Sequence, residues 1–126
     1  MRNCFIIFAF IFALGSPPAM AQLYARGQFA RDLTMGIEWL RCSIGQRWSE
    51  ETQDCVGEII PLDFDLIEQA ITQANSQLGG EWRLPTEDEL VTLICKECGT
   101  PMIDAKTFPN TWPDSYWTRD KNSMSS

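Results

Sequence analysis

Residues 79–90 constrain the fold of this chain more tightly than any other stretch. Gly79 and Gly80 predict the end of a helix and a turn, because glycine accepts the positive φ that a helix C-terminus requires. Pro85 cannot continue a helix, and it holds the residue before it, Leu84, in an extended conformation. The first half of the stretch therefore predicts a helix end followed by a short extended segment.

The second half predicts the start of another helix. Thr86 suits the N-cap position, and Glu89 three residues later completes the pattern of a capping box. The three carboxylates of residues 87–89 lie in the first turn, where the helix dipole favours negative charge. Leu90 begins a stripe of apolar side chains at helical spacing, and we expect the helix to end near Ile94.

A longer amphipathic helix is predicted before this stretch. Asp63 or Asp65 supplies its N-cap, and Gly79 ends it. One face is apolar and the opposite face is polar, which is the pattern of a surface helix that covers a sheet. The apolar face is formed by Ile67, Ala70, Ile71, Ala74 and Leu78. Further upstream, the alternation of apolar and charged residues over residues 37–41 predicts a half-buried strand.

The chain begins with the pattern of a secretory signal peptide. An apolar run over residues 5–14 follows Arg2, and Ala19 and Ala21 supply the small residues of a cleavage site. The run is too short to span a bilayer as a helix. We therefore expect residues 1–21 to be removed on export, a secreted or periplasmic location, and no membrane span after cleavage.

Charge and composition exclude several classes of function. The net charge of −7 becomes −8 when the leader is removed, because the leader contains Arg2 and no acid. An acidic chain without a basic cluster repels polyanions, so no nucleic-acid partner is expected. The sequence has no histidine, which removes the commonest general base and any Ser-His-Asp triad. No catalytic residue, metal or cofactor is predicted, and the chain is not expected to be an enzyme.

Four cysteines remain after the leader, and an even number in an exported chain predicts disulfides. Three pairings are possible, and we favour Cys42–Cys55 and Cys95–Cys98 because each closes a short loop. The second pair also fits a redox dithiol or half of a zinc site. Its position after a helix, beside Glu97, disfavours a reactive thiolate. A zinc site would need a second ligand pair of matching spacing, so the redox hypothesis ranks second and zinc third.

Calcium binding by loop oxygen ligands is a further hypothesis, and the sequence supports it only weakly. Asp104, Asn110 and Asp114 could offer oxygen ligands, but Asn and Asp in loops are usually turn formers.

Five motifs, found in the same order, give the chain a resemblance to a known family. They are Thr34-Met35-Gly36-Ile37-Glu38-Trp39, Cys42-Ser43-Ile44-Gly45-Gln46-Arg47-Trp48 through Cys55, Trp82-Arg83-Leu84-Pro85-Thr86 with Glu89-Leu90, Ile103-Asp104 with Phe108-Pro109-Asn110-Thr111, and Tyr116-Trp117-Thr118. Over roughly residues 30–118 the chain resembles the C-terminal domain family of the Legionella collagen-like protein. The resemblance implies a secreted domain with the C-type-lectin-like fold, which formylglycine-generating enzymes share, and it does not imply catalysis.

We therefore predict a small α+β domain, C-type-lectin-like, with two helices beside a short antiparallel sheet. A patternless lead over residues 22–31 precedes the domain at 32–118, and a disordered tail over 119–126 follows it. In the resembled family further strands follow the strand at 116–118, whereas the tail here has no apolar alternation. We therefore expect an incomplete sheet with exposed edges, as in a truncated copy of the domain.

Side chains in these motifs divide into structural residues and candidates for ligand contact. Arg83 is expected to bond backbone carbonyls or a carboxylate such as Asp104 or Glu89. Trp48 is expected to pack on the Cys42–Cys55 bridge, with stacking on a sugar as the alternative, whereas ligand contact and core packing are equally supported for Trp112 and Tyr116. The structural set is Trp82, Arg83, Leu84, Pro85, Thr86 and Glu89, and the candidate ligand contacts are Trp48, Trp112 and Tyr116.

Two functions from different classes follow. The first is an exported, non-enzymatic binding or adhesion module, with a carbohydrate or an envelope or host protein as partner. The namesake of the resembled family is associated with adhesion to sulfated glycans, a ligand that the acidic charge of this chain does not favour. The second is an exported thiol–disulfide oxidoreductase that uses Cys95 and Cys98, for which analogy of fold is weak support. A truncated copy without function is a third hypothesis.

Overall fold

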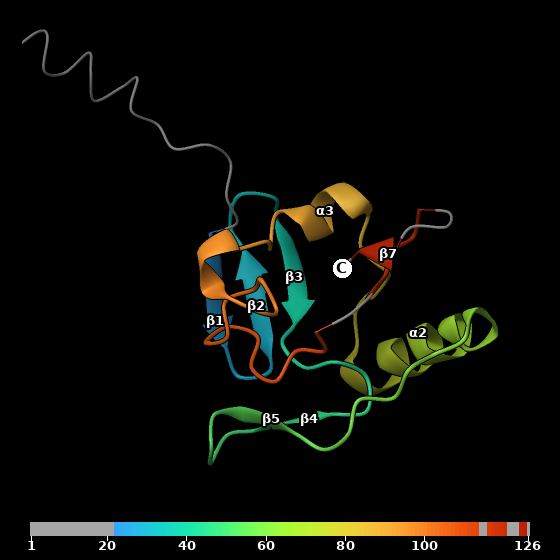
Figure 1. Cartoon of the computed structure of the whole chain (residues 1–126). Coiled ribbons are helices and arrows are strands. Elements are labelled where there is room, and N and C mark those ends of the chain that lie inside the picture. The colour runs from blue at the N-terminus through green and yellow to red at the C-terminus, as the bar shows by residue number, and fades with distance from the viewer. Residues whose placement is uncertain (1–21, 114–115, 121–123, 126) are drawn as a thin grey trace, which may run out of the picture.

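A computed structural model describes residues 22–113, 116–120 and 124–125 of the chain (Figure 1). The leader predicted over residues 1–21 lies outside the described residues. Within them, helices α2 and α3 lie beside three small antiparallel sheets, which confirms the α+β class. No described helix is long and apolar enough to cross a membrane.

The largest sheet contains three strands in the order β1-β2-β3, at Leu23–Arg26, Phe29–Asp32 and Ile37–Leu40. The strand predicted over residues 37–41 is therefore confirmed as β3. The prediction of a patternless lead over residues 22–31 is wrong, because this segment forms β1 and most of β2. The side chains of β1 are mostly exposed, so the strand is held by its backbone ladder to β2 and leaves no hydrophobic alternation in the sequence.

The core packs on one face of this sheet. Ala30 of β2 is fully buried and contacts Leu93 and Phe108, which come from segments far along the chain. The side chains that pack around them are Leu23, Trp39, Leu90 and Ile103. Because successive strand residues face opposite sides, Phe29 lies on the other face of the sheet. There its ring stacks on Trp82, with the ring centroids 5.6 Å apart.

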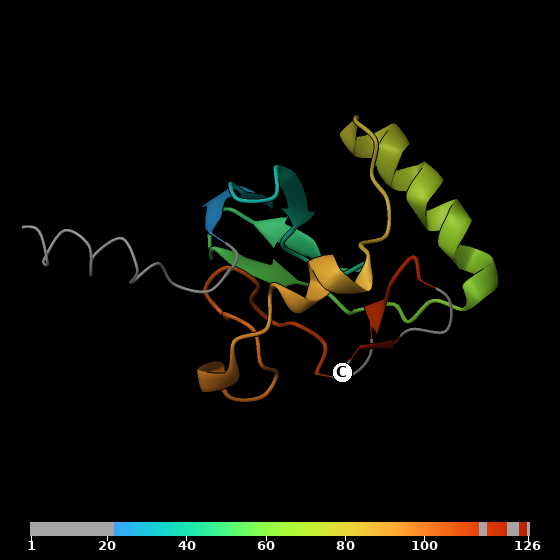
Figure 2. The same ribbon diagram turned by 90° about the horizontal axis from the view of Figure 1, so that it is seen from above.

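Helix α2 spans Phe64–Leu78 and ends at Gly79, as predicted. Asp63 occupies the N-cap position, although its side chain makes no capping hydrogen bond. Ile67 is buried, and the remaining members of the predicted apolar face are half-buried. Figures 1 and 2 show that α2 stands to one side of the three-stranded sheet.

The segment between the helices confirms the local predictions made from residues 79–90. It leads extended from Gly79 to the N-cap Thr86, and α3 follows at Glu87–Val91. The capping box is complete, since the Thr86 hydroxyl accepts from Glu89 N at 3.1 Å and the Glu89 carboxylate accepts from Thr86 N at 2.8 Å. The helix is shorter than the predicted end near Ile94, and it ends in a turn in which Thr92 Oγ1 donates to the Glu89 carbonyl at 2.6 Å.

The remaining elements are short. Strands β4 and β5, at Arg47–Ser49 and Asp54–Val56, form a hairpin, and a 3₁₀ turn, η1, occupies Lys96–Cys98. Strand β6 at Tyr116–Trp117 pairs antiparallel with β7 at Met124–Ser125.

The prediction that residues 119–126 contain no strand is wrong. Strand β7 lies in this segment, and two residues before it contact the start of α3. Arg119 N donates to the Pro85 carbonyl at 2.8 Å, and the Asp120 carboxylate accepts from Glu87 N at 2.5 Å. These contacts use the backbone and a helix N-terminus, so they leave no hydrophobic pattern in the sequence.

Candidate functional site

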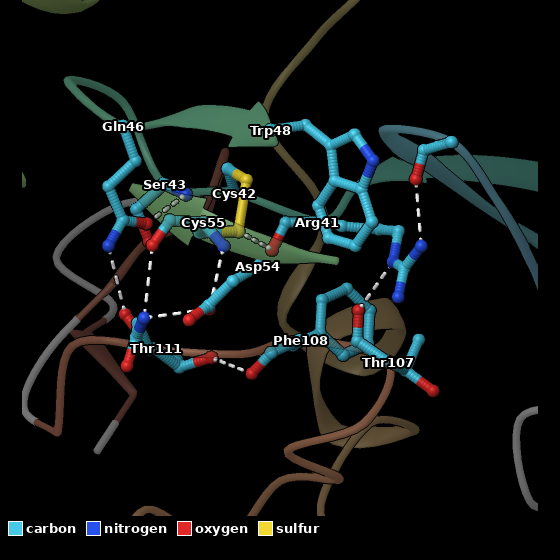
Figure 3. The surroundings of a disulfide bond; sticks show 12 residues. Arg41, Cys42, Ser43, Gln46, Trp48, Asp54, Cys55, Thr107, Phe108 and Thr111 are labelled. Atoms are coloured by element: carbon cyan, nitrogen blue, oxygen red, sulfur yellow. Dashed lines mark hydrogen bonds between the residues drawn. A yellow bond between two sulfur atoms is a disulfide. The ribbon is translucent and has the colours of Figure 1, made fainter. Parts of the chain in front are cut away.

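Cys42 is bonded to Cys55, which ties the end of the three-stranded sheet to strand β5 (Figure 3). Cys55 is 2% exposed. The adjacent loop is held by Asn110, whose Nδ2 donates to Asp54 Oδ1 at 2.8 Å and to the Cys55 carbonyl at 3.0 Å. Asn110 adopts a φ of 55°, a conformation that Asn tolerates better than most residues. This disulfide is therefore part of the framework that positions the loops.

Cys95 is bonded to Cys98 across the η1 turn. Cys95 lies beyond the end of α3, as the sequence indicates, and serves as the N-cap of η1. Its Sγ lies 3.6 Å from Glu97 Oε2, and that carboxylate would disfavour a thiolate after reduction. Within residues 22–113, 116–120 and 124–125, no group of three or more Cys, His, Asp or Glu residues could hold a metal ion. Of the oxygen ligands considered for calcium, Asp114 lies outside the described residues.

Arg83 and Glu89 form the bidentate ion pair that the sequence suggested as one alternative. Nη1 and Nη2 of Arg83 each donate to a different Glu89 oxygen, both at 2.8 Å. Arg83 Nη1 also donates to the Leu84 carbonyl at 3.1 Å. The hydrogen bonds from Arg83, with the contacts to Thr86, lower the pKa of Glu89 from 4.5 to about 2. This pair fixes the extended segment against the start of α3.

Trp48 lies beside the Cys42–Cys55 bridge, but one face of its ring is covered. The Arg41 guanidinium lies over the indole, 4.0 Å from the ring centroid. Figure 3 shows the two side chains next to each other. The indole Nε1 donates to Glu50 Oε1 at 3.0 Å. These contacts leave Trp48 less suited to stacking on a sugar than an open aromatic face would be.

Arg41 is a structural residue that the sequence did not single out. It is 8% exposed, and its guanidinium donates to the carbonyls of Gly27, Lys106 and Thr107 at 2.7, 3.0 and 2.8 Å. Burial lowers the pKa of Arg41 from its usual value, although Glu50 acts in the opposite direction. The side chain thus links the β1–β2 turn to a loop more than sixty residues later. No local sequence pattern signals such a contact.

The structure brings Trp112 and Tyr116 together and leaves Trp48 apart from them. The Tyr116 hydroxyl accepts from Trp112 N at 2.8 Å and lies 2.8 Å from Ser43 Oγ. Tyr116 is half-buried and its hydroxyl is engaged, whereas Trp112 is 42% exposed. Both side chains line an apolar groove between α2 and the sheet.

This groove has a volume of about 370 Å³. Its walls are the apolar face of α2, the end of β3, the extended segment before α3 and the aromatic residues near β6. Two of its lining residues are bonded to each other: Trp117 Nε1 donates to the Leu62 carbonyl at 2.9 Å, which connects β6 to the start of α2. Its lining includes the apolar and aromatic side chains of Ile67, Ala70, Ile71, Ala74, Leu84, Leu90, Trp112, Tyr116 and Trp117.

A second hollow, of about 350 Å³, lies between β3 and residues 79–85. We call it the slot. It shares Trp39, Leu40 and Trp82 with the apolar groove, so the two hollows adjoin. The slot is more polar than the groove, because its lining includes Glu38 and Glu81.

Comparison with protein families gives one match. The family model of the Lcl C-terminal domain matches residues 28–126, which is most of the chain. No curated protein and no solved structure matches the chain. The C-type-lectin-like fold therefore stays a prediction, whereas the family resemblance is confirmed. The chain belongs to the Lcl C-terminal domain family, the C-terminal domain family of the Legionella collagen-like protein.

Proposed function

We propose that this chain is an exported, non-enzymatic binding module that takes up an apolar segment of a partner protein in the groove beside α2. The observation that carries the proposal is the groove itself: a hollow of about 370 Å³ lined by apolar and aromatic side chains. Ligand sites in proteins are concave and mostly apolar, with a small number of polar groups. The two disulfides are consistent with export, because disulfides persist in oxidising compartments.

The groove favours a protein segment over a carbohydrate. A sugar needs aromatic faces together with free polar groups, but the Tyr116 hydroxyl is already bonded to Ser43 and Trp112, and Arg41 covers one face of Trp48. Trp112, with 42% of its surface exposed, is the aromatic that supports the carbohydrate alternative best. An apolar protein segment would instead bury its side chains against α2 and gain hydrophobic free energy.

Two substitutions on α2 test the proposal. Ala74 lines the groove, and Ala74→Phe places an aromatic ring in it. Gln73 is exposed on the other face of the same helix, so Gln73→Phe adds the same side chain outside the groove. The chain purified after export, with its disulfides intact, is used to select binders from a display library of random linear peptides. We expect apolar peptides that lose at least about tenfold in affinity on Ala74→Phe and retain it on Gln73→Phe.

Two results would contradict this proposal. One is a library that yields no peptide above background. The other is a set of peptides whose affinity is the same for Ala74→Phe and Gln73→Phe, since such peptides would bind elsewhere. Binding of neutral glycans that is lost on Trp112→Ala would favour the carbohydrate alternative.

The exposed Cys98 supports the second candidate function, thiol–disulfide exchange. In that reaction a thiolate of a reduced partner attacks one sulfur of the Cys95–Cys98 bond, the other sulfur leaves as a thiolate, and a second partner thiol completes the exchange. Glu97 beside Cys95 works against it. Disulfide exchange that is unchanged by Cys95→Ser would remove this function.

A further inference from the structure

We propose that the partner segment binds as an added β-strand, paired with the open edge of β3 and seated in the slot. This inference rests on the proposed function and specifies the conformation and composition of the partner: an extended segment that alternates apolar residues with polar ones and carries at least one lysine or arginine. Three observations support it: the hydrogen-bonding pattern of β3, the position of the slot, and the charge around it.

Along the outer edge of β3, backbone groups have no partner among the residues that the structure describes. In the order β1-β2-β3, β3 is an edge strand. Arg41 N donates to the Gln28 carbonyl at 3.0 Å, and hydrogen-bonded pairs alternate along an antiparallel ladder. Trp39 therefore bonds to β2, whereas Glu38 and Leu40 direct their N–H and C=O groups away from it. No hydrogen bond joins these groups to any part of the chain that the structure describes.

The slot places empty volume beside this edge. Its walls are β3 on one side and residues 79–85 on the other, and both Glu38 and Leu40 line it. Figures 1 and 2 show residues 79–86 leading from α2 past the sheet to α3. An unpaired strand edge beside a hollow is the arrangement that accepts a peptide by strand addition, in which backbone hydrogen bonds supply affinity and pockets for alternate side chains supply specificity.

The adjoining groove determines the side chains of the added strand. The slot and the groove share Trp39, Leu40 and Trp82, so a strand in the slot lies next to the apolar lining of the groove. Since successive side chains of a strand point to opposite faces, only every second residue would enter the groove. The expected partner segment therefore alternates apolar residues with residues that face solvent or the acidic border of the slot.

The charge of the slot favours a basic partner over a second copy of this chain. Glu81 has no hydrogen-bond or ion-pair partner among the described residues, whereas Arg83 already neutralises Glu89. Arg31 lies 3.7 Å from Glu38, but both side chains are exposed, so this ion pair neutralises the Glu38 charge only weakly. The slot is therefore negative overall, and the chain as a whole carries −7. Two copies would bring like charges together at this edge, whereas a lysine or arginine would pair with Glu81.

Backbone methylation of the peptide tests strand addition separately from groove binding. Peptides selected from the random library as above are synthesised with one N-methyl group at each position in turn. An added strand directs alternate N–H groups towards β3, so methylation at every second position should lower affinity by about tenfold, and methylation at the positions between should change it little. Equal effects at all positions, in a peptide that Ala74→Phe still weakens, would overturn strand addition and leave the groove as a binding site.

Two substitutions at Glu38 provide the matching test on the protein. Glu38→Pro removes the outward N–H, and proline is tolerated on an edge strand whose N–H faces outward. Glu38→Ala removes the side chain and keeps the N–H. We expect Glu38→Pro to bind the selected peptides about tenfold more weakly than Glu38→Ala does, with circular dichroism spectra that match. Equal affinity of the two variants would overturn the proposal, as would a stable dimer of the free chain that dissociates on Glu38→Pro.

Discussion

The ion pair between Arg83 and Glu89 gives the stability of this domain a specific dependence on pH. We expect Glu89→Gln to destabilise the fold at pH 7, because it removes the charge while a side-chain oxygen remains to accept from Thr86 N. The pKa of Glu89 falls from 4.5 to about 2 in the folded chain. Each pKa unit corresponds to about 1.4 kcal/mol, so this shift corresponds to roughly 3 kcal/mol of folding stability at most.

Exposure of the arginine reduces that value. The Arg83 side chain is 45% exposed, whereas that of Glu89 is 12% exposed, so solvent screens the pair in part. We therefore expect a loss of about 1–2 kcal/mol in the free energy of unfolding. Because the folded pKa is depressed, this contribution is fully present above pH 4.5 and is lost as the pH falls towards 2.

Urea unfolding of the parent chain and of Glu89→Gln, at several pH values between 7 and 2, measures this contribution. Glu68→Gln on the exposed face of α2 is the matched control, because the Glu68 carboxylate has no partner among the described residues. The gap between parent and Glu89→Gln should narrow below pH 4.5 and close near pH 2. A Glu89→Gln variant as stable as the parent at pH 7, or a gap that is constant down to pH 2, would show that the ion pair does not stabilise the fold.

The remaining predictions concern other contacts of the scaffold. Arg41→Met should cost about 2–4 kcal/mol, because it leaves three carbonyls without their donor, whereas Arg47→Met on an exposed position should cost little; urea unfolding compares them, and equal losses would contradict this role. Replacing Cys42 and Cys55 by alanine should cost about 3 kcal/mol, and replacing Cys95 and Cys98 about 2 kcal/mol, because the second loop is shorter. A lower urea midpoint for the variant without Cys95 and Cys98 than for the variant without Cys42 and Cys55 would contradict this ranking of the two disulfides.

The parts of the fold that the sequence predicted are those set by local chemistry. Gly79, Pro85, Thr86 and Glu89 determine a helix end, an extended segment and a capped helix start within a single short stretch, and each appears in the structure as predicted. Helix α2 was likewise predictable, because its apolar spacing persists over several turns.

The parts that the sequence did not predict depend on contacts between distant segments. Strands β1 and β7 are short and held by backbone ladders, so no hydrophobic alternation marks them. Asp32 looks like a surface residue but is fully buried, because its Oδ1 accepts from Thr34 N and Met35 N in the turn after β2. A carboxylate that stabilises a turn in this way gives no signal of burial in the sequence.

The candidate site was partly predictable, because some of its side chains stand out in the sequence whereas its shape depends on distant segments. Trp112 and Tyr116 were recognisable as aromatics near prolines, and they do line the apolar groove. The open edge of β3 and the slot beside it could not be predicted, because they depend on where residues 79–85 lie relative to the sheet.

Amide hydrogen exchange at β3, with and without a selected peptide, reports directly on the edge of this strand. We propose that the partner segment pairs with that edge, and this pairing has a specific signature. It predicts that the amides of Glu38 and Leu40 exchange fast in the free chain and slowly in the complex, while the amide of Trp39, already bonded to β2, changes least. Unchanged exchange at Glu38 and Leu40 in a saturated complex would contradict it.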